Sequence, residues 1–328
     1  MSVLVTGGAG YIGSHTVRAL RARGDDVIVL DTLETGYIPA LLGAALVTGD
    51  VADTELVRKL VAEHGVDRVI HFAGYKNAGE SMHVPGKYFE NNVTGTARLL
   101  RALEDTEVRT FVFSGSCSVY GTPRSLPVGE SSPLHPESPY GQSKLMGEQM
   151  LRWYGEIQGL RWMSLRYFNA AGASLDAAIG EDFAQSLNLV PLVMKATLGL
   201  RPPVQVFGTD FPTPDGTAVR DYIHVEDLAD GHLRALDHLE SGGASAAVNL
   251  GTGTGSSVRE VIETTEQLSG KRVPVELASR RLGDPSAIWA DNNFAAELLG
   301  WAPRYGLAEI IETAWRWHST RPGGYLTT

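Results

Sequence analysis

The sequence contains one cysteine, Cys117, among 328 residues. A single thiol excludes an internal disulfide and a multi-cysteine metal site, and such cysteine usage is typical of a reducing compartment. We interpret Cys117 either as a small buried residue or as a residue with a special role. No metal ligand set is predicted.

Long apolar runs are missing as well. No stretch approaches the roughly 20 apolar residues that a membrane span needs. Residues 1–6 lack the basic region, apolar run and cleavage site of a secretory signal. We therefore expect no membrane association and a cytoplasmic location.

Positive charge is in deficit. The chain has 28 Lys and Arg against 38 Asp and Glu, a net charge of −10. Proteins that bind nucleic acid present dense positive charge, so we expect no nucleic-acid partner. An anionic ligand would need a local basic pocket.

Short apolar runs alternate with amphipathic helical stretches over the first 170 residues. Apolar runs stand at 3–6, 27–31, 68–72 and 110–114, and a helical pattern covers 12–23. This rhythm predicts a doubly wound, parallel α/β sheet of the Rossmann type. We expect a first domain at 1–170, rejoined around 217–240, and a smaller α/β substrate domain at 171–328 that this return interrupts.

Three glycines at intervals of three follow the first apolar run. Gly7 permits a tight turn, Gly10 allows the backbone to approach a pyrophosphate, and Gly13 lets the next helix pack closely. Asp31 ends the next strand, where a carboxylate can accept hydrogen bonds from an adenosine ribose. The pattern predicts a dinucleotide site, and Asp31 favours NAD because it would repel the 2′-phosphate of NADP.

Tyr140 and Lys144 lie four residues apart at the start of a predicted helix. Both side chains then share one helix face, and an ammonium nearby would lower the tyrosine pKa toward that of a general base. Ser116 follows the run at 110–114, at the strand edge where α/β folds bind ligands.

These motifs resemble those of the extended short-chain dehydrogenases/reductases, and within them the UDP-glucose 4-epimerases. The resemblance runs nearly end to end and is carried by residues 6–15, 71–81, 140–149, 166–169, 207–216 and 220–232. It implies that Tyr140 removes the proton of the sugar 4-hydroxyl while hydride passes to NAD. Ser116 would relay that proton, and Lys144 would bind the nicotinamide ribose and keep Tyr140 acidic.

The resemblance also implies a set of binding residues. Those expected at the cofactor, besides the three catalytic residues, are Gly7, Gly10, Tyr11, Ile12, Gly13, Asp31, Thr32, Asp50, Val51, Phe72, Ala73, Gly74, Lys76, Asn91 and Phe168. Those expected at a UDP-hexose, besides Ser116 and Tyr140, are Lys76, Asn169, Asn188, Leu189, Gln205, Phe207, Arg220, Arg281, Asp284 and Ile288. Arg220 and Arg281 would supply the local positive charge. The family further implies a homodimer packed through helices near 85–105 and 140–154.

Two positions depart from the family pattern. Gly115 stands where serine is usual, and we expect it to loosen the loop without removing chemistry. Ile288 stands at the position that limits space beside the sugar C2 substituent, where tyrosine excludes N-acetylated sugars and a small residue admits them. Its intermediate size leaves UDP-N-acetylhexosamines open as substrates.

Four other functions compete with an epimerase. Dehydratases and decarboxylases of the superfamily carry an acidic residue just after the catalytic serine or threonine, where this chain has Cys117 and Ser118. A carbohydrate dehydrogenase would reduce added NAD stoichiometrically. An inert dinucleotide sensor need not keep Ser116, Tyr140 and Lys144 together.

Overall fold

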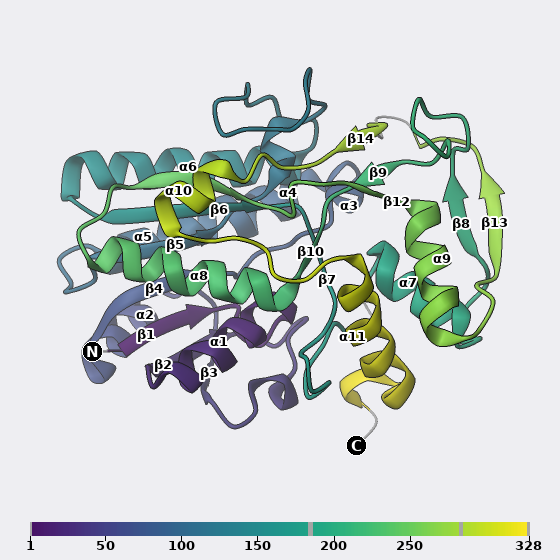
Figure 1. Cartoon of the computed structure of the whole chain (residues 1–328). Helices are drawn as coiled ribbons and strands as arrows, with labels where there is room; N and C mark the ends of the chain where they lie inside the picture. Colours follow the sequence, from purple (N-terminus) through teal and green to yellow (C-terminus); the bar gives the residue numbers. More distant parts are fainter. Residues whose placement is uncertain (1, 183–185, 282–284, 327–328) are drawn as a thin grey trace.

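The computed structural model describes residues 2–182, 186–281 and 285–326. Its largest element is a sheet of seven parallel strands in the order β11-β6-β5-β4-β1-β2-β3 (Figure 1). The strands are β1 (Ser2–Thr6), β2 (Asp26–Asp31), β3 (Ala45–Thr48), β4 (Val66–His71), β5 (Thr110–Ser114), β6 (Arg161–Tyr167) and β11 (Ala246–Leu250). The predicted doubly wound parallel sheet is therefore confirmed.

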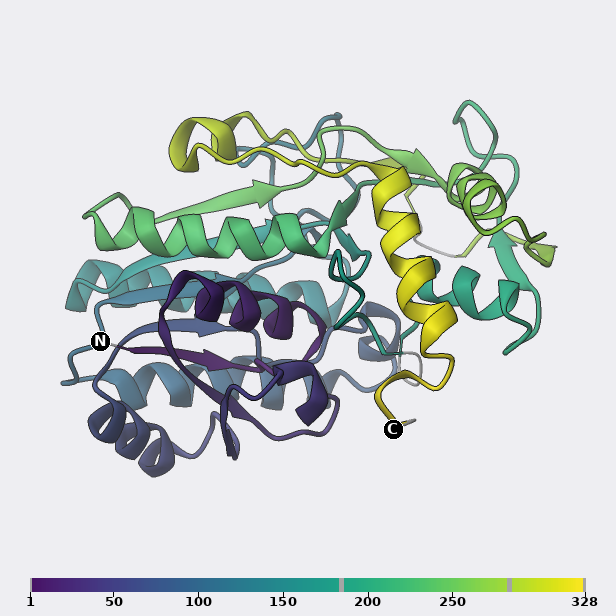
Figure 2. The ribbon, with the colours of Figure 1, turned by 60° about the horizontal axis from the view of Figure 1, so that its bottom comes forward.

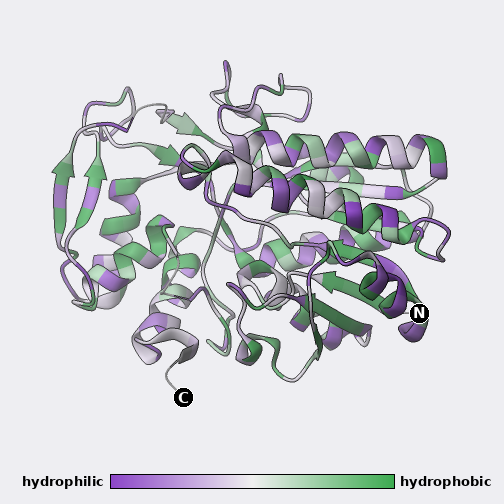
Figure 3. Ribbon diagram, turned by 180° about the vertical axis from the view of Figure 1, so that it is seen from behind, coloured by the Kyte–Doolittle hydropathy of each residue, from purple (hydrophilic) through white to green (hydrophobic). Residues whose placement is uncertain are grey.

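Helices cover both faces of this sheet, which explains why its strands are apolar almost throughout. One face carries α1 (Tyr11–Arg23), α8 (Val225–Glu240) and α10 (Asn293–Leu299). The other carries α2 (Thr54–His64), α5 (Gly95–Leu103) and α6 (Pro139–Gln158). Figure 2 shows α1 and α8 side by side, and in Figure 3 the strands near the N-terminus are green between helices of mixed colour.

Shorter elements connect the strands at the carboxyl edge of the sheet. They are η1 (Ile38–Leu41), α3 (Ala78–Ser81), α4 (Pro85–Tyr88), a π-helical turn (Phe89–Thr94) and a 3₁₀-helix (Cys117–Tyr120). The strand order reverses between β1 and β4. Ligands of open α/β sheets bind at such a switch point, so the fold itself marks this edge.

In the later part of the chain the described residues form three small sheets around a separate apolar core. They pair β7 (Asn169–Ala171) with β10 (Tyr222–His224), β8 (Val204–Phe207) with β13 (Val275–Ala278), and β9 (Val219–Arg220) with both β12 (Ser256–Ser257) and β14 (Ala287–Ile288). The helices here are α7 (Leu189–Thr197), α9 (Val258–Ser269) and α11 (Leu307–Thr320), followed by η4 (Gly324–Leu326).

The chain returns to the large sheet over a longer stretch than 217–240. Helix α8 packs on α1, β11 pairs with β6 as the last strand of the sheet, and α10 packs on β11. Trp301 lies fully buried in the same core. The division into two domains stays a prediction, and these contacts would place residues up to about 301 partly with the first domain. In the described residues, no helix combines the length and the apolar character that crossing a membrane requires.

Candidate active site

The glycine loop lies at the switch point, directly after β1. Gly7 has a φ of 70°, and a Cβ on it would stand 2.5 Å from the backbone nitrogen of Ala73, the second residue after β4. A Cβ on Gly13 would stand 2.4 Å from the carbonyl oxygen of Gly7. Helix α1 follows Gly10 without a side-chain cap, so its first N–H groups point toward the loop.

Asp31, at the end of β2, is fixed against this loop. Its buried carboxylate accepts hydrogen bonds from the backbone N–H of Ala9 at 2.9 Å and of Leu33 at 2.8 Å. Each oxygen retains a further lone pair, so the carboxylate can still accept from a ligand hydroxyl. The structure thus brings Asp31 beside the glycine loop.

The other residues expected at the cofactor also gather at the carboxyl edge. They follow successive strands of the sheet: Thr32 after β2, Asp50 and Val51 after β3, Phe72, Ala73, Gly74 and Lys76 after β4, Ser116 after β5 and Phe168 after β6. Tyr11 and Ile12 begin α1, and Asn91 lies in the π-helical turn. The Tyr11 hydroxyl donates to the carbonyl of Gly172, which links the loop to the later part of the chain.

Helix α6 begins just before the predicted base. Ser138 caps the helix by accepting from the N–H of Gly141 at 3.1 Å, and proline occupies the first helical position. Tyr140 is buried, and its N–H donates to the Ser81 hydroxyl at 3.2 Å. The Ser116 side chain hydrogen-bonds to Tyr140, so these two residues meet.

The pKa of Tyr140 moves in the direction opposite to the one expected. Burial raises it to about 12, and the hydrogen bond with Ser116 only partly offsets this rise. The Lys144 ammonium is also buried, which lowers its pKa to about 8. It donates to the carbonyl of Ser114 at 2.9 Å and lies 6.0 Å from the centre of the Tyr140 ring. Loss of hydration on burial is therefore the largest cause of both pKa shifts in the free protein.

A buried ion pair fixes α6 to the sheet. Glu148, one turn beyond Lys144, accepts from Arg166 on β6 at 2.9 and 2.6 Å and from the Ser164 hydroxyl at 2.8 Å. Gly115 makes room for this contact, because a Cβ there would stand 2.5 Å from the Ser164 Oγ. The position is thus closely packed, and the expectation that Gly115 loosens the loop stays a prediction.

Asn92 joins three segments of the site, although the sequence indicated its neighbour Asn91. Its amide nitrogen donates to Ser143 Oγ and to the carbonyl of Tyr75, both at 3.0 Å, and its oxygen accepts from the Tyr75 N–H at 2.8 Å. Asn92 lies in the π-helical turn, and such turns occur frequently at functional sites. Only Asn91 carried a family signal, so sequence reasoning missed this residue.

The residues expected at the substrate come from the smaller sheets and from α7. Arg220 on β9 and Ile288 on β14 stand in register as neighbours. Asn169 begins β7, Asn188 and Leu189 begin α7, and Gln205 and Phe207 belong to β8. The Arg281 guanidinium lies 3.8 Å from the centre of the Phe207 ring. Asp284 lies outside the described residues.

Ile288 is buried in a small apolar cluster that reaches helix α6. The cluster includes Phe168 and Leu145, and Cys117 packs against it. Burial raises the pKa of the Cys117 thiol to about 12, so it is not an activated thiolate. This favours the interpretation of Cys117 as a packing residue.

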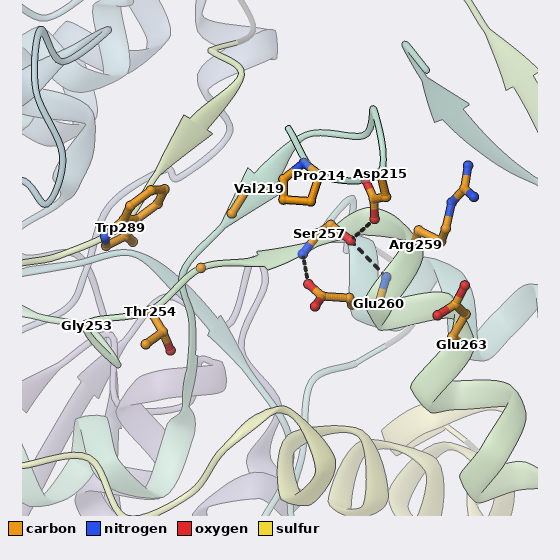
Figure 4. Close-up of a pocket in the computed structure, with 11 residues that line it drawn as sticks. Pro214, Asp215, Val219, Gly253, Thr254, Ser257, Arg259, Glu260, Glu263 and Trp289 are labelled. Atoms are coloured by element: carbon orange, nitrogen blue, oxygen red, sulfur yellow. Dashed lines mark hydrogen bonds between the residues drawn. The ribbon is translucent and has the colours of Figure 1, made fainter. Parts of the chain in front are cut away.

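A groove of about 600 Å³ lies elsewhere, on the side of β9, β12 and β14 that faces α9 (Figure 4). Trp289 lines it, whereas its neighbour Ile288 belongs to the buried cluster, as alternation along a strand requires. Its polar groups bond to one another, since Ser257 lies between Asp215 and Glu260 and hydrogen-bonds to both. The groove lacks the catalytic residues, and the candidate site remains at the sheet edge.

Comparisons with known proteins identify the family of this chain. Residues 3–251 match the model of the NAD dependent epimerase/dehydratase family. The chain is 46% identical to the UDP-glucose 4-epimerase of Halalkalibacterium halodurans, over 100% of this chain and 98% of that protein.

Two crystal structures of UDP-glucose 4-epimerases superpose closely on this fold. The enzyme from Brucella ovis, in complex with NAD, has a TM-score of 0.94 at 45% identity and covers 96% of this chain and 97% of its own. The enzyme from Bifidobacterium longum, in complex with NAD+ and UDP, has a TM-score of 0.93 at 40% identity. This match covers 99% of the present chain and 100% of the Bifidobacterium chain. By its sheet topology, its motifs and these matches, the chain belongs to the UDP-glucose 4-epimerase family, within the NAD dependent epimerases/dehydratases.

Proposed function

We propose that this protein interconverts UDP-glucose and UDP-galactose by transient oxidation of the sugar at C4. The observation that carries the proposal is the meeting of Ser116, Tyr140 and Lys144 at the sheet edge that also holds the glycine loop. Relatives at 46% and 45% identity over nearly the full chain are UDP-glucose 4-epimerases, which supports this reaction.

The residues at the switch point fit NAD as the cofactor. The backbone of Gly7 and Gly13 passes where no side chain has room, and the open first turn of α1 suits a pyrophosphate. Asp31, beside this loop, would accept a hydrogen bond from a ribose hydroxyl. Bound NAD would supply the acceptor, and then the donor, of the C4 hydride. The loop residues after β2, β3 and β4, with Asn91 and Phe168, would line the rest of the cofactor.

The protein's own residues handle the proton. Tyr140 would take the proton of the 4-hydroxyl, and Ser116, hydrogen-bonded to Tyr140, would hold and relay it. With a pKa of about 12, Tyr140 needs help to ionise. Lys144, already near its ring, would stabilise the phenolate and bind the nicotinamide ribose. Return of the hydride to the opposite face of the 4-keto sugar, with return of the proton from Tyr140 to the 4-oxygen, would give the epimer, and no external reductant would be consumed.

The substrate side would bind UDP through two arginine side chains and the N-terminus of helix α7. Arg220 and Arg281 would pair with the diphosphate, with Asn169, Asn188 and the start of α7 at Leu189 beside it. Gln205 and Phe207 would lie at the uracil, Asp284 at the uridine ribose, and Lys76 near the hexose. Ile288 would bound the space at C2 and leaves N-acetylated hexoses as a second substrate class.

The homodimer is also a proposal, through the helices near 85–105 and 140–154. On α6, Trp153 and Ile157 are 54% and 74% exposed and lie one turn apart. Two large apolar side chains on one exposed helix face favour a subunit contact. We also propose a cytoplasmic location, since a lone cysteine suits a reducing compartment.

The test is to mix purified protein with UDP-galactose and to follow UDP-glucose formation without added NAD. Epimerisation should occur, and Tyr140→Phe should abolish it. Tyr154→Phe is the matched control, because Tyr154 lies on the same helix but hydrogen-bonds to Glu104 at 2.8 Å. Accumulation of NADH with no epimer would contradict the proposed reaction and point to a dehydrogenase.

A further inference from the structure

Glu181 is a buried carboxylate between β7 and α7 that sequence reasoning did not single out. One of its oxygens, Oε1, accepts three hydrogen bonds: from Lys76 Nζ at 3.2 Å, Ser186 Oγ at 2.7 Å and Asn188 Nδ2 at 2.8 Å. Its side chain is only 5% exposed. Its backbone carbonyl accepts a hydrogen bond from the Trp317 indole at 2.9 Å, so helix α11 holds the backbone of Glu181 in place.

Two of these three donors are groups that we place at the substrate. Lys76 comes from the loop after β4, and Asn188 stands at the start of α7. Glu181 therefore connects the NAD-binding edge with the substrate side through one atom. The ion pair with Lys76 also offsets the negative charge that a carboxylate would otherwise present to a diphosphate.

The Asn188 side chain is hydrogen-bonded to Glu181 and does not cap helix α7. Asparagine at a helix N-cap normally accepts from an N–H of the first turn, yet Asn188 makes no such bond. Pro191, at the third helical position, has no N–H to offer. Among the described residues, the N–H groups of Leu189 and Val190 have no hydrogen-bond acceptor, so both remain open to a ligand.

We propose that Glu181 is a positioning residue for the nucleotide diphosphate: by holding the Asn188 carboxamide, it keeps the first N–H groups of α7 open for phosphate oxygens. The inference deepens the proposed function and rests on it. Without Glu181, the Asn188 side chain turns back to cap Val190 and competes with the ligand. An N-cap of this kind contributes about 1 kcal/mol, which corresponds to a loss of about fivefold in affinity.

The experiment measures UDP binding by titration calorimetry, in the presence of NAD. Glu181→Ala should weaken UDP binding by about fivefold. Simple electrostatics predicts the opposite, since removing a carboxylate should tighten the binding of an anion. Glu181→Gln, which keeps an oxygen to accept from Asn188, should stay within about twofold of the unsubstituted protein.

A double-mutant cycle separates this role from general structural damage. In an Asn188→Ala background, where no side chain can cap Val190, Glu181→Ala should weaken UDP binding no further. An equal loss in both backgrounds, or undiminished affinity in Glu181→Ala, would overturn the proposal. Glu266→Ala is the control, because the Glu266 carboxylate on α9 accepts a hydrogen bond outside this cluster, from the backbone N–H of Val273 at 2.9 Å.

The proposed function is assayed in parallel on the unsubstituted protein. If UDP binds with the expected dependence on Glu181 but UDP-galactose is not epimerised, the proposed reaction fails and the role of Glu181 stands. If epimerisation occurs and the cycle shows no coupling between Glu181 and Asn188, the role of Glu181 alone fails.

Discussion

Lys144 and Tyr140 share one face of α6, but the Lys144 ammonium is bonded to the Ser114 carbonyl and lies 6.0 Å from the centre of the Tyr140 ring. Both groups are buried, and burial disfavours the charged form of each. The pKa of Tyr140 therefore rises to about 12 while that of Lys144 falls to about 8. At neutral pH in the free protein Tyr140 therefore stays protonated while Lys144 keeps most of its positive charge, and ionisation of Tyr140 is left to the loaded site.

The buried Lys144 should make folding stability depend on pH. Its pKa falls from 10.5 to about 8 on folding, so between these values the unfolded chain binds a proton that the folded protein has released. Stability should then rise by about 2 kcal/mol from about pH 8 to about pH 9.5. Urea unfolding of the unsubstituted protein and of Lys144→Met measures this. Equal changes in both proteins would contradict it.

Ile288→Tyr should abolish any turnover of UDP-N-acetylglucosamine and spare UDP-glucose. Ile288 is 7% exposed and packs with Phe168 and Leu145, so a larger side chain there must take space from the substrate. Initial rates with both substrates measure the change in preference. Trp289→Ala is the matched control, because Trp289 lines the groove in Figure 4 and should leave the preference unaltered. Unchanged N-acetyl turnover in Ile288→Tyr would refute this role.

Arg166→Met should destabilise the protein by about 3–5 kcal/mol, because it leaves Glu148 as an unpaired buried charge. The double variant with Glu148→Met should recover much of this loss, since an apolar pair replaces the ion pair. Denaturant titrations of the two single variants and the double variant give the coupling. If the loss of unfolding free energy in the double variant equals the sum of the losses in the two single variants, Arg166 and Glu148 do not act as a pair.

Trp153→Glu together with Ile157→Glu should convert the proposed dimer to a monomer. The substitutions place two carboxylates on the exposed face of α6, where a desolvated contact would have to bury them. Sedimentation velocity measures the mass of the particle. Leu277→Glu is the control, because Leu277 is 73% exposed on β13, away from α6. A monomer before substitution would rule out this dimer.

Much of the site could be read from the sequence because its signals are local. The glycine spacing after β1, the carboxylate at the end of β2 and the four-residue spacing of Tyr140 and Lys144 each depend on one strand, turn or helix. Parallel strands bring their carboxyl ends to one edge, so these separate signals converge in the fold. The helical pattern of 227–239 likewise indicated the return of the chain to the first domain, although not the extra strand β11.

The sequence by itself determined the doubly wound sheet and the glycine loop, because strand and helix periodicity and fixed spacing encode them, and its resemblance to a family indicated the candidate catalytic residues. Only the tertiary structure decided the pKa values of Tyr140 and Lys144, which depend on burial by distant segments. It alone placed Glu181 against Lys76 and Asn188, and Ile288 beside Arg220. Glu181 lies 105 residues from Lys76 and 7 from Asn188, and Ile288 lies 68 residues from Arg220. No local sequence pattern shows which side chains bond to the same buried oxygen or which residues stand in register on neighbouring strands.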